Sequence, residues 1–184
     1  MAIKGSEIRN ALTGQRIKFL QTSSDTNGSF LEMIATYEKK STVPPVHYHP
    51  YQEEFFEIIS GELSVRINGE VEVLGPGHQL CIPKGISHTM WNDTSNPTVI
   101  RWRVAPALDT EKFLETVTTL GNDGKIGANG KAGMFQLALT INRFDKVFRL
   151  SRPPYILQKI FFLLLSPFAN FFGYRAEEKC EALD

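Results

Sequence analysis

Three histidines and one glutamate are spaced so that they could hold a metal ion. His47, His49 and His88 are three of only four histidines in the chain. His47 and His49 are two residues apart, so on a β-strand their imidazoles point to one side with Cα atoms roughly 6.5 Å apart. Glu54 follows a short loop and can supply a carboxylate. If the strand that begins at His88 pairs with the first, the set becomes three nitrogens and one carboxylate, which suits a divalent first-row metal.

Two neighbouring side chains are weaker ligand candidates. Alternation along a strand sends Glu53 to the side opposite Glu54, and His78 stands beside a turn glycine, where we expect it to be solvated. Four protein ligands around a six-coordinate ion leave two positions for water or substrate. We therefore expect one divalent transition metal per chain, with Fe, Mn, Ni, Cu and Zn as the candidates.

The elements that must position these ligands are short strands in the first part of the chain. Gly, Pro and Asn separate β-rich runs up to about residue 106, and strands at intervals of about 8–12 residues are typical of a sandwich or barrel. The predicted strands are 15–21, 29–37, 54–60, 63–68, 70–74, 79–82, 88–92 and 98–105. In the last of these the apolar residues are expected inward and the arginines outward; inward arginines, which could bind a substrate carboxylate, are the alternative.

The motifs around the ligands resemble those of the cupin superfamily. The first cupin motif has two histidines one residue apart, then a glutamate and a later glycine, and it is matched by His47, His49, Glu54 and Gly61. The second motif combines a glycine, a Pro-x-Gly turn, a histidine and an asparagine, and it is matched by Gly77, Pro83, Gly85, His88 and Asn92. The resemblance is detailed over residues 40–105.

The resemblance implies an all-β fold, a cupin jelly-roll β-barrel with a C-terminal α-helical extension. It also implies that His47, His49, Glu54 and His88 bind the metal, because they occupy the ligand positions of the family. We expect residues 1–106 to form the cupin β-barrel domain and residues 107–184 to form a helical extension packed on the barrel or on a dimer partner. Because cupin barrels commonly dimerise, we expect a homodimer.

A substrate pocket can be sketched from the period of two along the strands. The side chains that follow Glu54 on the inward face are Phe56 and Ile58, and those that follow the third histidine are Met90 and Asn92. These residues predict a mostly apolar cavity with one polar focus, which suits a small organic molecule.

The chain beyond residue 107 predicts helices. Asp109 can cap a first helix, a second is expected over 134–141, and Pro153-Pro154 precedes a last one over 155–172. The last helix contains 15 consecutive uncharged residues from Ile160 to Tyr174, fewer than the roughly 20 that span a bilayer, and a proline interrupts it. An apolar surface all round indicates burial on the barrel or on a second subunit. In-plane membrane association of 155–174 is the alternative, since basic residues stand at both ends.

Composition excludes several classes of protein. The chain has 184 residues with 20 Lys+Arg and 20 Asp+Glu, so its formal net charge is zero, and it offers no basic field to a nucleic acid. Two distant cysteines make no disulfide scaffold. No apolar stretch follows the first charged residues, so no signal peptide is visible and a cytoplasmic location is expected.

Three functions remain open for such a site. The first is a dioxygenase-like oxidoreductase acting on a small aromatic or enol-type substrate, because quercetinase-like cupins use three histidines and a glutamate; Glu54 would then also be the catalytic general base. The second is a non-oxidative isomerase or lyase acting on a sugar or keto acid. The third is a non-catalytic, metal-containing module that binds a small molecule. The family hosts many activities, so the fold alone does not decide among them.

Overall fold

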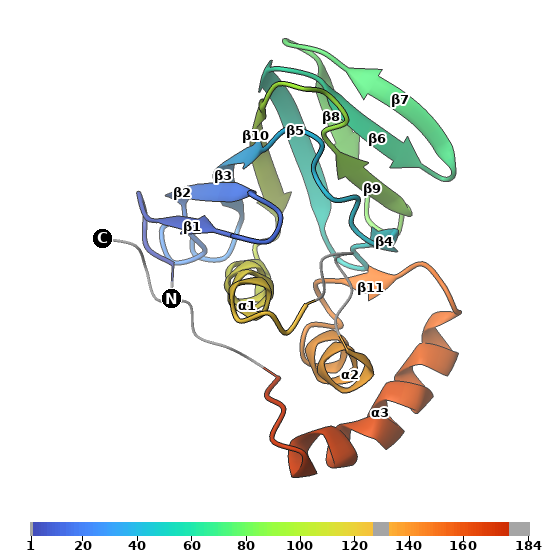
Figure 1. Ribbon diagram of the computed structural model, residues 1–184. Helices are drawn as coiled ribbons and strands as arrows, with labels where there is room; N and C mark the ends of the chain where they lie inside the picture. Colours follow the sequence, from blue (N-terminus) through green and yellow to red (C-terminus); the bar gives the residue numbers. More distant parts are fainter. Residues whose placement is uncertain (1, 127–132, 177–184) are drawn as a thin grey trace.

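The strands form two antiparallel sheets in the computed structural model, which describes residues 2–126 and 133–176 (Figure 1). The six-stranded sheet has the order β1-β2-β3-β10-β5-β8, and the five-stranded sheet has the order β11-β4-β9-β6-β7. The bounds of the strands are β1 Glu7–Arg9, β2 Arg16–Gln21, β3 Leu31–Tyr37, β4 His47–Tyr48, β5 Glu53–Ser60, β6 Leu63–Ile67, β7 Glu70–Leu74, β8 Gln79–Ile82, β9 His88–Trp91, β10 Thr98–Ala105 and β11 Arg149–Leu150.

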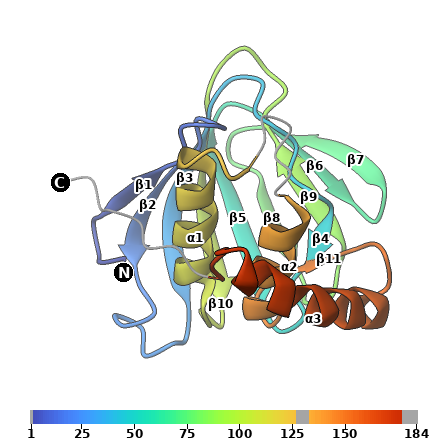
Figure 2. The same ribbon diagram turned by 60° about the horizontal axis from the view of Figure 1, so that its bottom comes forward.

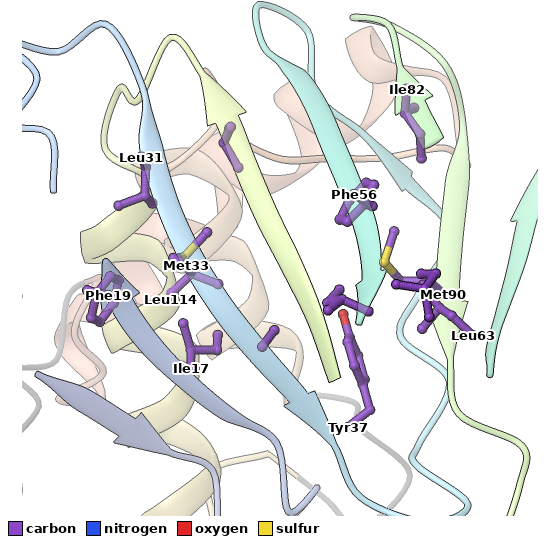
Figure 3. Packing of buried hydrophobic residues seen from close by; sticks show 14 of the residues in the cluster. Ile17, Phe19, Leu31, Met33, Tyr37, Phe56, Leu63, Ile82, Met90 and Leu114 are labelled. Atoms are coloured by element: carbon purple, nitrogen blue, oxygen red, sulfur yellow. The ribbon is translucent and has the colours of Figure 1, made fainter. Parts of the chain in front are cut away.

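The main core lies between the sheets and follows from alternation along the strands. In β3 every second residue from Leu31 to Tyr37 is buried, which is the period that a strand with one inward face requires. Figure 3 shows Met33, Phe56 and Leu63 among the side chains of this core. On β10 the arginines are exposed and the flanking apolar residues face inward, as the alternation predicted.

The jelly-roll arrangement is confirmed, but the sheets do not close into the predicted barrel. Every strand pairing among the described residues lies within one sheet or the other. The physical reason is visible at β4, which has only two residues and whose outer edge is taken by β11, with Arg149 opposite Tyr48 and Leu150 opposite His47. A strand from the C-terminal region thus fills the edge that closure would need. The result is a double-sheet jelly roll.

Three helices follow the strands, as expected for the C-terminal region. They are α1 Thr110–Asn122, α2 Met134–Arg143 and α3 Tyr155–Phe171. Helix α1 lies against the six-stranded sheet (Figure 2) and contributes Leu114 to the main core. The Glu111 carboxylate fixes α1 to the loop after β2, because it accepts hydrogen bonds from the backbone N–H and hydroxyl of Ser23 at 2.6 and 2.8 Å.

Helices α2 and α3 pack on each other around a second, smaller core. Ala138 and Ile141 from α2 and Phe162 from α3 are its buried members. Helix α3 continues through Pro167, where the sequence predicted an interruption. Within the described part of the chain, no helix combines the length and the apolar content needed to cross a bilayer.

Steric constraints explain why the first motif has glycine at position 61. Gly61 sits in the turn between β5 and β6 with φ of +78°, a region that side chains rarely adopt. A Cβ at this position would lie 2.6 Å from the carbonyl oxygen of Pro97 and 2.9 Å from the Cα of Thr98. The close approach of these two chain segments therefore requires glycine.

The side chain of Gln52 forms hydrogen bonds with the segment that connects β10 to α1. Its side chain is 1% exposed, and its Nε2 donates to the carbonyls of Pro106 and Ala107 at 2.8 and 3.0 Å and to the hydroxyl of Thr110 at 2.7 Å. These bonds connect the loop between β4 and β5, which contains His49, to the start of the helical region.

Replacing Gln52 with alanine should lower the free energy of unfolding by about 1–3 kcal/mol, because the amide that donates hydrogen bonds to the start of the helical region is lost. Urea unfolding monitored by circular dichroism measures the change. Gln79→Ala is the matched control, since Gln79 is exposed on β8 and surface substitutions change stability by about 0.5 kcal/mol or less. Equal stabilities for the two variants would contradict the assigned role of Gln52.

Candidate metal centre

The three histidines come together at the end of the five-stranded sheet. His47 on β4 lies directly opposite His88 on β9 in the strand register, and His49 is the first residue after β4. One ring nitrogen from each histidine lies within 4.8 Å of the other two. The ring centroids are 4.5 Å apart for His47 and His88, and 5.2 and 5.3 Å apart for the pairs with His49. Three imidazoles in this arrangement could hold a metal ion.

The backbone selects which nitrogen each imidazole offers. Nδ1 of His47 lies 2.8 Å from the carbonyl oxygen of Pro45, and Nδ1 of His88 lies 2.9 Å from that of Ile86. Nδ1 of His49 bonds to the carbonyl of Val147, 98 residues later in the chain. A carbonyl only accepts, so each Nδ1 carries the proton and donates it. In its neutral form each ring therefore offers Nε2 as the nitrogen with a lone pair, and a further proton on any ring would have to sit on Nε2.

Glu54 on β5 places its carboxylate against two of these nitrogens. Its Oε2 lies 3.2 Å from Nε2 of His49 and 2.9 Å from Nε2 of His88, while Oε1 accepts a hydrogen bond from Nε1 of Trp102 at 3.1 Å. The residue is 2% exposed. The carboxylate thus borders the same space as the imidazoles.

Two of the facing atoms lack a hydrogen-bond partner, and this argues that the residues fit a metal ion. Nε2 of His49 and Oε2 of Glu54 are both buried and unpaired. A carboxylate oxygen that faces imidazole lone pairs is repelled unless a positive charge lies between them. A proton can provide that charge, and so can a divalent metal with nitrogen and oxygen ligands.

The charges of the metal-free site follow from these contacts. Burial, together with the adjacent His49 and His88, lowers the pKa of His47 to about 3, so this ring is neutral. Burial alone would lower the pKa of His49, but the Glu54 carboxylate outweighs it and raises that pKa. Burial alone would raise the pKa of Glu54, but the two imidazoles beside it lower it. Without metal, one proton is thus shared by a charged His49–Glu54 pair.

A mostly apolar cavity of about 270 Å³ opens beside the imidazoles. Its walls come from both sheets and from the helical region, and they include Tyr37, Met90, Trp102, Phe113, Leu137 and Phe148. Phe148 stacks on the ring of His47, with centroids 4.5 Å apart and planes at 24°. Helices α1 and α2 and the segment before β11 therefore wall the space in front of the candidate metal ligands.

The structure places only one of the four predicted pocket residues on the cavity wall. Met90 lines it, while Phe56 and Ile58 lie in the core between the sheets. The Asn92 side chain instead holds loops together, donating to the carbonyls of Tyr37, Glu38 and Asn96. Alternation along the strands correctly predicted that these side chains are buried. It could not predict which buried residues line the cavity and which lie in the core.

Several residues of the site carried no sequence signal for it. Phe148 and Val147 precede a strand of only two residues, β11, which is too short to be recognised from periodicity. Trp102 was expected inward, but nothing in the sequence indicated its hydrogen bond to Glu54. Glu53 and His78 are exposed, in line with the expectation that neither is a ligand.

In comparisons with known proteins, a family model matches the part of the chain that forms most of the two sheets. A family model described as a cupin domain matches residues 33–104. An oxidoreductase of Arthrobotrys oligospora is 37% identical over 59 residues, which are 32% of this chain and 23% of that protein. A probable oxidoreductase of Hypocrea virens is 30% identical over 103 residues, 52% of this chain and 47% of that protein. The chain thus matches less than half the length of these curated relatives.

Among solved structures, the chain is similar to an RmlC-like cupin from Shewanella frigidimarina. The identity is 19% and the TM-score is 0.49, with 58% of this chain and 88% of the other covered.

Alanine at His49 or His88 should weaken metal binding by at least about 100-fold, because each change removes a ligand and leaves the Glu54 carboxylate without one of its facing imidazoles. Elemental analysis of purified protein, followed by metal titration, measures the effect. His78→Ala is the matched control, since this imidazole is exposed and bonds only to the nearby carbonyl of Gly75. A His47/His49/His88 triple alanine variant that retained stoichiometric metal would rule the site out.

Metal binding near pH 6 should release about one proton per ion, because the ion replaces the proton on the His49–Glu54 pair while His47 is already neutral. The apparent affinity should accordingly rise with pH until His49 loses its proton in the metal-free protein. Calorimetric titrations in buffers of different ionisation enthalpy measure the released proton. Heats that are independent of the buffer at pH 6 would show that the pair holds no proton to displace.

Proposed function

We propose that the protein, whose residues 33–104 match a family model described as a cupin domain, is a metal-dependent oxidoreductase of the dioxygenase type. Its substrate would be a small aromatic or enol-type organic molecule. The observation that carries the proposal is the placement of three Nε2 lone pairs and one carboxylate on the wall of a mostly apolar cavity. The oxidoreductase names of the two relatives favour redox chemistry over the alternatives.

His47, His49, His88 and Glu54 would hold the metal in this proposal. Fe, Mn, Ni and Cu bind to such ligands, and when bound, a redox-active ion would supply the path for electrons between an organic substrate and O₂. The protein's own contribution is to orient the four side chains. Backbone carbonyls fix the three rings, and Trp102 fixes the carboxylate through Oε1.

The cavity wall favours a flat, apolar substrate. Phe148 and Phe113 stack on each other with centroids 5.1 Å apart, and Trp102 and Met90 add further apolar surface. Most of the cavity surface is apolar, so many hydroxyls of a bound sugar would lack partners, and unpaired buried hydroxyls are costly. This argues against the isomerase or lyase alternative.

Tyr37 is a further candidate for orienting the substrate. It lines the cavity, and burial together with the Glu54 carboxylate raises the pKa of its hydroxyl well above the ordinary value. The hydroxyl therefore stays protonated at neutral pH. We propose that it donates a hydrogen bond to an oxygen of the substrate.

Glu54 has two proposed roles that can be separated. As a ligand it contributes charge to the metal, and as a general base it accepts the proton of a substrate hydroxyl. The lowered pKa of Glu54 keeps it ionised and able to accept a proton, but it also reduces the basicity of the carboxylate. The first role is therefore the better supported.

Protein loaded with Fe, Mn, Ni or Cu should consume O₂ in the presence of a flavonol or catechol-like compound, as measured with an oxygen electrode. Glu54→Gln should reduce the rate at least about 100-fold, since the amide retains an oxygen for Trp102 but loses the charge. Loss of metal in this variant assigns Glu54 to binding, whereas retained metal with lost turnover assigns it to proton transfer. Glu53→Gln, at the exposed neighbouring position, is the matched control.

Absence of O₂ uptake with every metal form and every compound would refute the dioxygenase proposal. Anaerobic turnover of a sugar or keto acid would then support the non-oxidative enzyme. Ligand binding without any turnover would support the binding module.

A further inference from the structure

Helix α3 turns an apolar surface away from the protein. We call this surface the outer face of α3; it comprises Ile156, Leu157, Ile160, Phe161, Leu163, Leu164, Phe168 and Phe171, which are between 47% and 85% exposed. Only Gln158, Phe162 and Ala169 of this helix are buried. Within this chain α3 packs against α2 along one side (Figures 1 and 2). Of the two expected partners for the segment, the sheets and a second subunit, neither covers the outer face in the structure of the single chain.

The outer face is larger than the apolar patches of ordinary surfaces. At 3.6 residues per turn its members cover about half of the helix circumference, wider than the roughly 100° stripe that packs one helix on a core. With about 100 Å² per side chain at these exposures, it presents on the order of 800 Å², above the 300–600 Å² of the largest patch on a typical monomer. Such a surface calls for an apolar partner.

The basic residues around α3 indicate that the partner surface is negatively charged. The stretch 146–176 contains five basic residues and no acidic one, in a chain whose net charge is zero. Lys146, Arg152 and Arg175 in this stretch are exposed, and Lys159 pairs with Asp145 at 2.5 Å. Four acidic residues follow in 177–184, outside the described residues. An apolar face within a basic segment is complementary to a partner that has an apolar interior and negative charge at its boundary with water.

We propose that α3 binds in the plane of an anionic lipid membrane, with its outer face in the acyl region and its basic neighbours among the headgroups. Helices with a wide apolar face and basic flanks bind membranes in this way. A second copy of the chain fits less well, because pairing through α3 would bring two basic segments together. The outer face also has no polar side chain, whereas protein interfaces carry about one hydrogen bond per 100–200 Å².

The proposal is tested by flotation of the full-length protein with lipid vesicles. The protein should float with vesicles that contain phosphatidylglycerol, float less with phosphatidylcholine alone, and lose binding as salt screens the headgroups. The double variant Leu164→Glu/Phe171→Glu should bind at least about tenfold more weakly, because two inserted side chains become charged. Val71→Glu/Val73→Glu is the matched control, since these apolar residues are also more than half exposed but lie on β7.

A second measurement does not depend on a destabilising change. In Phe168→Trp the new indole should be quenched by lipids brominated in the acyl chain, relative to the parent protein, which places the outer face within the bilayer.

Failure of the full-length protein to float with anionic vesicles would overturn the proposal, as would equal binding of the α3 variant. Light scattering that gave a dimer for the parent protein and a monomer for the α3 variant, without flotation, would assign the outer face to a second copy and would also overturn it. None of these outcomes depends on metal content or oxygen uptake.

Discussion

The buried carboxylate of Glu54 sets the constraint around which the site is arranged. A carboxylate removed from water is costly unless hydrogen bonds and positive charge compensate for the lost hydration. Trp102 supplies one hydrogen bond, but the second oxygen faces imidazole nitrogens whose partners on the far side are already fixed by backbone carbonyls. The protein therefore creates a place that only a cation can satisfy, and strands of both sheets must keep their register for that place to exist.

The helical region completes the site from the other side. Helices α1 and α2 and the segment before β11 close a space that the two sheets alone would leave open. The aromatic rings of Phe148 and Phe113 extend the surface of His47 toward α1. Helix α3 takes no part in this enclosure, since its wide apolar side faces outward. The residues after the last long strand thus contribute both to the cavity wall and to an exposed apolar face.

Much of the sheet structure and the grouping of the three histidines could be predicted from the sequence because both depend on local patterns. Alternation located the main strands within a few residues, and the spacing of His47, His49, Glu54 and His88 indicated one cluster. The remainder depends on contacts between distant segments. The two-residue strand β11 has no periodicity to detect, yet it pairs with the outer edge of β4 and extends the five-stranded sheet. Of the residues sketched for the pocket, only Met90 lines the cavity, because the far wall belongs to helices whose packing no strand pattern encodes.

The hydrogen bond from His49 to Val147 bears on how this chain can have evolved. Appended segments that serve only as linkers can be exchanged between genes by recombination without harm to the parent domain. Here an exchange of the residues beyond the last long strand would remove the acceptor that orients one imidazole and would uncover the edge of β4. The sheets and the C-terminal region are therefore expected to be inherited together and to accumulate compensating substitutions as one unit.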